Sequence, residues 1–331
     1  MTDSSELLMR PPTFDDVVTV AEFRDLCSMY DENRHSGTVE SWIRQWQTPG
    51  FDLERDVRLV FTPKNALVGM VLIWDIQPTH TYPVAWGRVH PEHRRRGIGT
   101  QLMLWAEQRA LDALSLAPPE ARVALESSVD SADEGTNNLL LAQGFSLVRR
   151  YYTMHIDLDA PAPAPVLPEG ITITSNVELQ NDRGFYDAFV DAFQDHWGFL
   201  PYTYENWLRS ETHEEYYDPS LWFAAMDGDE IAAICICTRK AYDDPDKGFV
   251  DDLGVRRAWR RRGIGVALLH HAFGEYYQRG IYKVGLGVDS ESLTGATRLY
   301  ERAGMHVQKT HNRYQKELRP GQDLAPQALQ E

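Results

Sequence analysis

The chain has 331 residues, of which 43% are hydrophobic, and carries a formal net charge of −16 at pH 7. This length predicts about two domains, and the apolar content excludes a disordered protein. The charge argues against nucleic-acid binding by bulk electrostatics and is compatible with a cationic small substrate, although solubility alone also explains it. We expect no membrane association, because there is no run of about 18 apolar residues and no signal-peptide pattern.

The cysteine content limits which disulfides and metal sites the chain can form. Cys235 and Cys237 are two positions apart in an apolar run and should share one face of a strand, while Cys27 stands alone. Neither a disulfide framework nor a zinc site is predicted from this number and spacing, so we expect no metal. A reduced, cytoplasmic protein is the expectation.

The first half predicts an amphipathic helical region followed by three strands. Apolar runs at 57–62 and 66–74 flank a short turn, which predicts a β-hairpin. A third strand, 84–89, leads into the hexapeptide RRRGIG at 94–99. A helix should follow, because Ile98, Gln101, Leu102, Trp105 and Ala106 recur with helical spacing and form one mostly apolar face.

The rest of this half predicts a strand, a helix and a second hairpin. The strand ends in Val129-Asp130-Ser131, and Gly144 reads as the C-cap of the helix. The hairpin should end near Leu158. The next stretch, DAPAPAPVLPEG at 159–170, favours an extended spacer, because alternating Ala-Pro disfavours helix and ladder bonding.

The second half repeats this order. Strands at 221–226 and 231–238 flank an Asp-Gly turn, and strand 249–255 leads into a second RRRGIG at 260–265. The helical face then comprises Ile264, Ala267, Leu268, His271 and Ala272. Val288-Asp289-Ser290, a capping Gly304 and a hairpin to about Leu318 complete the series, and the Pro/Gln-rich residues that follow should fray.

An ordered repeat of this kind predicts two tandem copies of one α/β (α+β) fold, each a mixed, mostly antiparallel sheet flanked by helices. The predicted domains are 1–158 and 170–318, with a linker at 159–169 and a tail at 319–331. Two fused copies can pack as a pseudo-dimer, so a monomer or a homodimer is expected.

The repeated hexapeptide has the features of an anion site. The first turn of a helix has unpaired N–H groups and the positive end of the dipole, and glycines let a phosphate approach the backbone. A tight turn with solvated arginines explains a single copy equally well. Two copies in the same setting favour the ligand.

These residues resemble the GNAT superfamily of acetyl-CoA-dependent acyltransferases, and the resemblance covers nearly the whole chain. The signature Arg/Gln-x-x-Gly-x-Gly/Ala is matched by Arg94-x-x-Gly97-x-Gly99 and Arg260-x-x-Gly263-x-Gly265. The resemblance implies acetyl-CoA (coenzyme A) as cofactor, with its pyrophosphate on the loop and its pantetheine arm along the preceding strand. The implied cofactor-binding residues are Arg88, Val89, Arg94, Arg95, Arg96, Gly97, Ile98, Gly99 and Thr100 in the first half and Leu253, Gly254, Val255, Arg260, Arg261, Arg262, Gly263, Ile264, Gly265, Val266 and Ser292 in the second.

The resemblance also implies where the chemistry lies. Tyr300, four residues before Gly304, stands where the family commonly has the acid that protonates the departing thiolate, although a core aromatic is the alternative. Leu140 stands at the same place in the first half. The chain therefore is similar to tandem proteins of the mycothiol synthase group, which often keep one active half.

An amine nucleophile needs a base, and Asp251 and Asp252 lie on the strand before the second motif. Neighbouring strand residues face opposite sides, and Asp252 is the preferred candidate because it shares a face with Gly254. Asp251 and Asp252 are explained equally well as carboxylates that are solvated or paired with arginines. Ala85 and Trp86 occupy the equivalent positions in the first half.

The stretch DHWGFLP at 195–201 also resembles the C-terminal half of the mycothiol synthase group, and this resemblance implies an acceptor pocket with Asp195, His196 and Trp197. A histidine beside a tryptophan is more often a helix-end or core residue than a base, but it titrates near neutral pH. The sequence thus predicts an enzyme that moves an acetyl group from acetyl-CoA to a small-molecule amine in its second half. The alternatives are an acyl-CoA-binding module with little turnover and a protein N-acetyltransferase.

Overall fold

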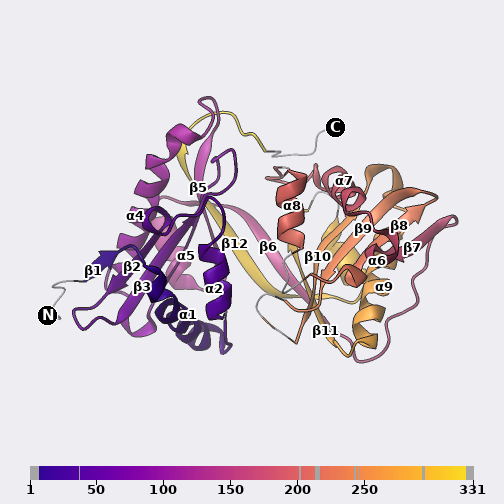
Figure 1. Cartoon of the computed structure of the whole chain (residues 1–331), viewed down its shortest axis with the longest axis horizontal. Coiled ribbons are helices and arrows are strands. Elements are labelled where there is room, and N and C mark those ends of the chain that lie inside the picture. The colour runs from indigo at the N-terminus through magenta and orange to yellow at the C-terminus, as the bar shows by residue number, and fades with distance from the viewer. Residues whose placement is uncertain are drawn as a thin grey trace. The chain divides into compact units, whose positions relative to one another are not determined.

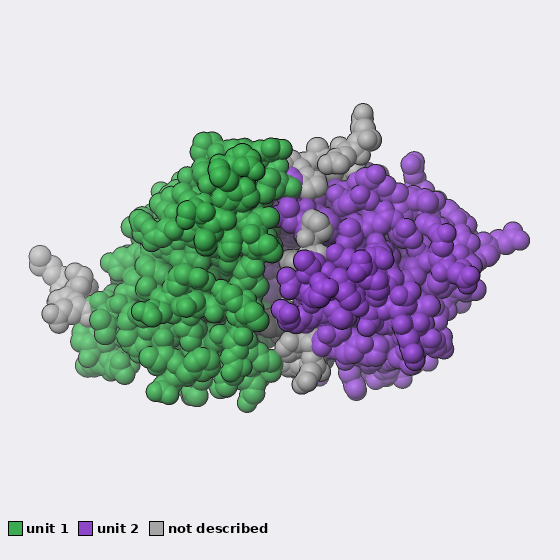
Figure 2. Space-filling model, turned by 45° about the horizontal axis from the view of Figure 1, so that its top comes forward, with its two compact units in different colours: residues 1–148, 312–324 green, residues 149–311, 325–331 purple. Residues whose placement is uncertain are grey.

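The computed structural model describes residues 7–36, 38–200, 203–212, 217–241, 244, 246–292 and 295–325. The chain forms two compact units, which are treated separately below (Figures 1 and 2). Unit 1 comprises residues 1–148 and 312–324, and unit 2 comprises residues 149–311 and 325–331.

Unit 1 is built on a mixed sheet with the strand order β1-β2-β3-β4-β5-β12. The strands are β1 (Leu8–Arg10), β2 (Val57–Phe61), β3 (Leu67–Trp74), β4 (Val84–Val89), β5 (Val123–Asp130) and β12 (His306–Arg319). The helices are α1 (Val17–Glu32), α2 (Val39–Trp46), α3 (Leu53–Asp56), α4 (Ile98–Asp112) and α5 (Glu134–Ala142), with short 3-10 turns at Phe14–Asp16, Pro91–His93 and Leu114–Leu116. Strands β1 to β4 are antiparallel, and β4 pairs with β5 in parallel.

Unit 2 repeats this plan with the strand order β6-β11-β10-β9-β8-β7. The strands are β6 (Ser146–Asp157), β7 (Ile171–Ser175), β8 (Trp222–Asp227), β9 (Glu230–Thr238), β10 (Gly248–Val255) and β11 (Lys283–Asp289). The helices are α6 (Asn176–Leu179), α7 (Asp182–Phe193), α8 (Tyr204–Glu211), α9 (Ile264–Gln278) and α10 (Ala296–Arg302), with 3-10 turns at Pro219–Leu221 and Arg257–Trp259. Strands β10 and β11 are parallel, and the other described pairs are antiparallel.

Each sheet buries both of its faces. In β3, Val71 and Ile73 join one apolar cluster with α4, while Met70 and Leu72 join another with α1 and α2. Alternate residues of a strand face opposite sides, so these two clusters lie on the two faces of the sheet. Unit 2 has the same arrangement, with α9 on one face and α7 and α8 on the other. The predicted fold class is confirmed.

The hairpins expected at the end of each half are wrong. A single strand stands in each place: β6 is 12 residues long and β12 is 14. Neither segment contains a glycine or a proline to make a tight turn, so each continues as one strand. Long single strands can reach beyond the half of the sequence that precedes them.

The two last strands are exchanged between the units, which changes the predicted domain boundaries of 1–158 and 170–318. Strand β6 pairs with β11 in unit 2, from Lys283↔Asp157 to Asp289↔Tyr151. Residues of β12 from Asn312 onward belong to unit 1. There, the Tyr314 hydroxyl donates to Asn137 Oδ1 at 2.8 Å, and Gln315 donates to Glu126 at 2.8 Å.

The linker and the tail also lie in other places than the sequence predicted. Residues 159–169 join β6 to β7, which both belong to unit 2, and Ala162 and Leu167 pack against the core of that unit. The tail is held as far as Gln322, whose N–H donates to the Glu120 carbonyl at 2.8 Å. Residues 326–331 of the tail lie outside the described residues.

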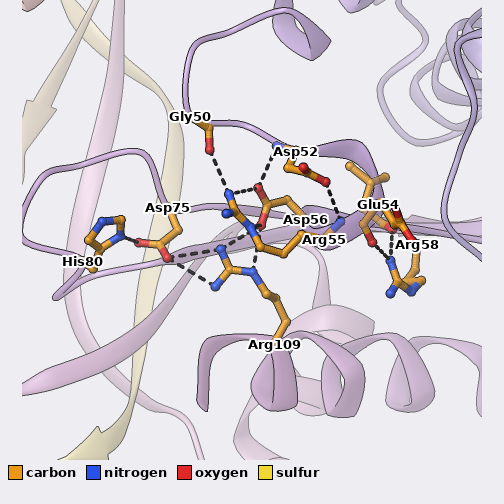
Figure 3. A network of polar contacts seen from close by, with 10 residues as sticks. Gly50, Asp52, Glu54, Arg55, Asp56, Arg58, Asp75, His80 and Arg109 are labelled. Atoms are coloured by element: carbon orange, nitrogen blue, oxygen red, sulfur yellow. Dashed lines mark hydrogen bonds and ion pairs between the residues drawn. The ribbon is translucent and has the colours of Figure 1, made fainter. Parts of the chain in front are cut away.

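Helix α4 of unit 1 is fixed to the sheet by a buried charge network (Figure 3). The Arg109 side chain is 6% exposed and donates through Nε to Asp56 at 2.8 Å. It also contacts Asp75 at 3.2 Å, and Asp75 in turn contacts His80 at 3.0 Å. Paired charges of this kind are costly to separate, so the network fixes the position of the helix that follows the first RRRGIG.

The strand exchange predicts which unit each terminal strand stabilises. Tyr314→Ala should destabilise unit 1 by about 3–5 kcal/mol, and Met154→Ala should destabilise unit 2 by about 2–5 kcal/mol, because both side chains are buried. Hydrogen exchange followed by mass spectrometry, read separately over the peptides of each unit, would locate the loss of protection. Faster exchange in unit 2 for Tyr314→Ala, or in unit 1 for Met154→Ala, would contradict the exchange of strands.

Candidate functional site

The parallel strand pair of each unit separates part-way along its length. In unit 2, β10 and β11 pair from Gly248↔Val284 to Val250↔Leu286, while β10 continues to Val255. In unit 1, β4 and β5 pair at Val84↔Glu126. The separation opens a cleft in each sheet, beside the end of the strand that leads into RRRGIG.

The cleft of unit 2 is a cavity of about 950 Å³ that runs from the separated strand to the second RRRGIG loop. It brings together most of the predicted cofactor-binding residues. Those on its wall are Leu253, Gly254, Val255, Arg260, Arg261, Gly263, Ile264, Gly265 and Val266, together with residues of α10 that include Tyr300.

Both hexapeptide loops have the same unusual backbone. Arg261 has φ 62° and Gly263 has φ 87°, and the matching Arg95 and Gly97 have φ 62° and 81°. Each of these glycines is the N-cap of its helix without a side-chain cap, and a Cβ at either would meet nothing within 4 Å. Uncapped N–H groups beside open space form a place for an anion.

The last glycine of each motif has a packing role. A Cβ on Gly265 would stand 2.9 Å from Leu299 of α10, and one on Gly99 would stand 3.1 Å from Leu139 of α5. Glycine therefore lets the two helices of each unit approach closely.

The first arginine of each motif holds its loop in place. Arg260 Nε donates to the Val255 carbonyl at 3.0 Å, and its guanidinium forms an ion pair with Asp195 at 2.9 Å. In unit 1, Arg94 Nε donates to the Val89 carbonyl at 3.2 Å and pairs with Asp31 at 2.8 Å. These two arginines therefore fix the end of the separated strand to the helix on the opposite face.

Asp195 takes part in this support, although the sequence suggested an acceptor contact for it. Its side chain is 3% exposed overall and pairs with both Arg257 and Arg260. The Arg257 guanidinium, followed by Arg260, lowers the pKa of Asp195 despite the opposing effect of burial. The carboxylate lies on the cavity wall but is occupied by arginines.

The third arginine of each RRRGIG motif does not line the cleft. Arg262 lies 3.9 Å from the Asp227 carboxylate, and Arg96 donates to the Glu92 carbonyl at 2.9 Å. Neither is on the wall of its cleft, whereas Arg261 and Arg95 are.

A smaller cavity of about 200 Å³ adjoins the cleft in unit 2. Tyr300 and His196 line both cavities, so they stand where the two meet. Tyr300 is 7% exposed, and burial raises its pKa, which keeps its hydroxyl protonated at neutral pH. Burial lowers the pKa of His196, which favours the neutral ring.

The other two predicted residues of this region also lie on the small cavity. Trp197 is on its wall, and the Arg149 guanidinium lies 5.3 Å from the Trp197 ring centroid. Ser292 is on the wall as well, but it does not open the helix as expected, because α10 begins at Ala296.

The acidic pair of β10 is arranged by a β-bulge. Val250 pairs with Cys237 and Asp252 with Ile236, so Asp251 is an extra residue in the ladder. Asp251 lines the small cavity. Asp252 does share the face of Gly254, as expected, but a Cβ on Gly254 would stand 2.7 Å from Ala192, so this face packs against α7.

Sequence reasoning missed Glu211, at the end of α8. Burial and the nearby Asp251 raise the pKa of Glu211 to about 7. Burial, Glu211 and Asp251 together raise the pKa of Asp252 well above its usual range. Glu211 lies 40 residues before Asp251 in a segment without a motif, so the sequence offered no signal for this electrostatic effect.

Unit 1 has a cleft that lacks counterparts of Tyr300 and of the acidic pair of β10. Its volume is about 580 Å³, and Arg88, Val89, Arg94, Arg95, Gly97, Ile98, Gly99 and Thr100 lie on its wall. Leu140 takes the place of Tyr300: Phe145 N–H donates to the Leu140 carbonyl as Met305 N–H donates to the Tyr300 carbonyl. Trp86 stands on the wall with the Arg24 and Arg88 guanidinium groups 4.7 and 5.2 Å from its ring centroid.

Two other features bear on the type of site. Cys235 and Cys237 are buried on one face of β9 with their sulfurs 3.5 Å apart, as predicted. Over the described residues, no cluster of His, Cys, Asp and Glu is arranged to hold a metal ion. In the same part of the chain, no helix has the length and apolar character needed to cross a membrane.

Known proteins share both the sequence and the fold. The model of the acetyltransferase (GNAT) family matches residues 22–125 and 183–305. The mycothiol acetyltransferase of Streptomyces scabiei is 29% identical over 78% of this chain and 79% of its own length. That of Rhodococcus erythropolis is 31% identical over 68% of this chain and 74% of its own.

Solved structures share the fold along nearly the whole length of the chain. A GCN5-related N-acetyltransferase from Sphaerobacter thermophilus is 36% identical, with a TM-score of 0.83 over 98% of this chain and 100% of that one. A tandem GNAT protein from the clavulanic acid biosynthesis pathway shares the fold at 17% identity, with a TM-score of 0.69 over 96% of this chain and 100% of that one.

The loop support makes a prediction about stability. Asp195→Asn should lower the free energy of unfolding of unit 2 by about 1–2 kcal/mol, because a buried carboxylate loses two ionic partners. Asp31→Asn, the matched change in unit 1, should cost less than about 1 kcal/mol, because its pair is more exposed. Urea unfolding at pH 7 measures both.

The lowered pKa of Asp195 adds a pH dependence to this prediction. Its contribution is fully present at pH 7 and is lost as the pH falls below 3.8, the ordinary value, through the lower folded value. The difference between the native protein and Asp195→Asn should therefore shrink in acid. An unchanged difference at low pH would show that the charge of Asp195 contributes nothing.

Proposed function

The chain belongs to the acetyltransferase (GNAT) family, and from this premise we propose that unit 2 transfers an acetyl group from acetyl-CoA to an amine of a small molecule. One observation carries the proposal. Tyr300 stands at the junction of two cavities, one that leads to the anion-binding loop and one that is small and lined by acidic and aromatic side chains.

The larger cavity fits the shape and charge of coenzyme A. The pyrophosphate requires N–H donors and positive charge, which the first turn of α9 and Arg261 supply. The pantetheine arm requires backbone partners, which Leu253, Gly254 and Val255 offer on the side where β11 has parted from β10. When bound, the coenzyme supplies a thioester whose sulfur can depart.

The proposed role of Tyr300 follows from its protonation state. A departing thiolate is stabilised by a nearby O–H donor, and burial keeps the Tyr300 hydroxyl protonated. The amine must lose a proton as it attacks, and the acidic pair of β10 lies on the same side of unit 2 as the source of a base. Neutral His196 can orient the acceptor at the junction.

The small cavity supports a small-molecule acceptor rather than a protein. Its volume of about 200 Å³ holds a short chain or a single ring, and Trp197 and Tyr151 offer flat surfaces on its wall. The Asp251 carboxylate on the wall suits an amine that arrives as a cation. The names of the relatives add mycothiol-related amines to the candidates.

For unit 1 we propose coenzyme A binding without turnover. Its loop has the same backbone conformation and its cleft is open, but Leu140 and Trp86 replace the acid and the acidic strand residue. All three cysteines are free, which supports the cytoplasmic location expected from the sequence. The oligomeric state, a monomer or a homodimer, stays a prediction.

A coupled assay of thiol release tests the proposed function directly. The purified chain is mixed with acetyl-CoA and a panel of amines, which should include diamines, amino sugars and mycothiol-related amines, with lysine peptides as the comparison. Thiol release that depends on a small amine, with the acetylated amine detected by mass spectrometry, supports the proposal. Release with peptides alone would assign the chain to protein acetylation, and coenzyme binding without release would make it a binding module.

Removal of the Tyr300 hydroxyl tests the proposed role of Tyr300 as the acid. Tyr300→Phe should lower kcat by about 10²- to 10⁴-fold and leave coenzyme A affinity nearly unchanged, because the ring and its packing remain. Adding Leu140→Tyr to this variant should not restore turnover, because Trp86 stands in the acidic position of unit 1. Steady-state kinetics with the best amine of the panel measures both. Full turnover by Tyr300→Phe would remove Tyr300 from the mechanism.

The glycine at each helix start tests coenzyme binding in each unit. Gly263→Val should weaken coenzyme A binding at unit 2 by about 2–4 kcal/mol, because a branched residue disfavours φ 87° and the loop N–H groups must move. Gly97→Val should do the same at unit 1. Calorimetry should give two sites for the native chain and one strong site for each variant.

Gly274→Ala is the matched control for this measurement. Gly274 lies in α9, the helix whose N-cap is Gly263, and an added Cβ there meets nothing within 4 Å. Its replacement should leave both sites intact and slightly stabilise the helix. Unchanged binding by Gly263→Val would contradict the assignment of the loop.

A further inference from the structure

The cleft of unit 1 reaches into the apolar core between its sheet and α4. Its wall extends from the RRRGIG loop to Val71 of β3 and to Leu102 and Met103 of α4. All three side chains are buried and belong to the apolar cluster that α4 forms with the sheet. Leu140 of α5 lies beside them on the wall. These four residues, here called the inner wall, give the cleft an apolar end that is continuous with the loop.

The corresponding core residues of unit 2 are covered. The counterpart of Val71 is Cys235, because Val71 pairs with Gly87 on β4 as Cys235 pairs with Leu253 on β10. Among the described residues of unit 2, Cys235 and the two α9 residues that match the α4 members of the inner wall line neither of the cavities described above. The cleft of unit 2 therefore stops short of the core that the cleft of unit 1 enters.

One cause of the difference is a residue of the strand that leads into the loop. Gly87 lies seven residues before the first arginine of its motif, and Leu253 lies at the same distance from the second motif. Leu253 packs against the core cluster that contains Cys235. Gly87 has no side chain to do so. A Cβ there would stand 2.7 Å from the Met70 carbonyl oxygen, so a larger residue would not fit without a shift of the strand.

Two further positions of unit 1 also have smaller side chains. Ser127, two residues before the Val-Asp-Ser segment, takes the place of Leu286. Leu140 takes the place of Tyr300, and both Ser127 and Leu140 line the cleft. The three replacements together remove about ten non-hydrogen atoms from the surroundings of one cleft, and close-packed interiors rarely leave such a volume without an occupant.

We propose that the cleft of unit 1 binds the coenzyme A thioester of an unbranched aliphatic acyl group of about four to eight carbons, with the acyl chain against the inner wall. This inference rests on the coenzyme A binding proposed above for unit 1 and names the thioester. An acetyl group is too short to contact the inner wall from the parted strands. In unit 2, Leu253, Leu286 and Tyr300 fill the same space, so the two units take different thioesters.

The charges around the cleft narrow the chemistry of the acyl group. The inner wall carries no ionisable side chain, whereas Arg94 and Arg95 belong to the loop. Arg88 alternates with Gly87 along β4 and packs against Trp86, which belongs to the apolar cluster on the face of α1 and α2. A carboxylate on the acyl chain would be buried against the inner wall without a partner, which is costly. The chain should therefore be apolar to its end.

Calorimetry with a series of thioesters tests this preference. The full-length chain with Gly263→Val, which should leave unit 1 as the strong site, is titrated with coenzyme A, acetyl-CoA, butyryl-CoA, hexanoyl-CoA and glutaryl-CoA. Each methylene buried should tighten binding by up to about 4-fold. Hexanoyl-CoA should thus bind about 10- to 10²-fold more tightly than acetyl-CoA, because ordering the chain offsets part of the gain. Glutaryl-CoA should show no such gain.

Refilling the cleft tests where the acyl chain lies. In the same background, Leu140→Tyr and, separately, Ser127→Leu restore the larger side chains of unit 2 and should lower the preference for hexanoyl-CoA by about 10-fold. Binding of free coenzyme A, which needs no room at the inner wall, reports that unit 1 of each variant is folded. Leu141→Tyr is the control, because Leu141 is 53% exposed on the same helix as Leu140. It should keep the full preference.

The possible results separate this inference from the function it rests on. If neither coenzyme A nor any thioester binds to the Gly263→Val chain, the proposed coenzyme site of unit 1 fails. If acetyl-CoA binds as tightly as hexanoyl-CoA, or if glutaryl-CoA binds most tightly, the coenzyme site stands and the apolar acyl site is wrong. A preference for hexanoyl-CoA that survives both Leu140→Tyr and Ser127→Leu would also overturn the assignment to the inner wall.

Discussion

The parting of two parallel strands creates the cleft of unit 2. Backbone N–H and C=O groups inside a protein need partners, and β10 loses its partner on one side after Val250. Arg260 satisfies the Val255 carbonyl at the far end of the gap. Between these points the strand presents unpaired backbone to a cavity, which is a binding surface for an extended, amide-containing chain. Closing the gap would remove the site without changing any side chain.

The two ends of this gap have different physical requirements. At one end the backbone must turn sharply into α9 and present its N–H groups, which requires positive φ at Arg261 and Gly263. At the other end the strand must release its neighbour and aim a carboxylate, which the bulge at Asp251 accomplishes. Asp195 and the arginines around it connect the loop to α7 on the opposite face. The two ends that we propose for anion binding and for acid–base chemistry are therefore both set by one strand.

The sequence was informative where structure is local. The hairpin of β8 and β9, the helices after each RRRGIG and the capping glycines all follow from residues within a few positions of each other. Strand exchange depends on pairing between β6 and β11, more than a hundred residues apart, and no local pattern records it. The bulge has the same origin, since it is a mismatch with β9 and not a property of Asp251. Glu211 is brought near Asp251 by the tertiary fold alone.

The comparison of the two units separates binding from chemistry. A non-glycine residue in the left-handed region costs about 1–2 kcal/mol, yet both Arg95 and Arg261 adopt it. If this strain served the acid–base steps alone, unit 1 would have no use for it, because Leu140 and Trp86 cannot move protons. We therefore propose that the strained loop serves anion binding, since both units share its backbone conformation. Under the function proposed above, the units differ in catalysis through side chains such as Tyr300 and Leu140, which lie outside the loop.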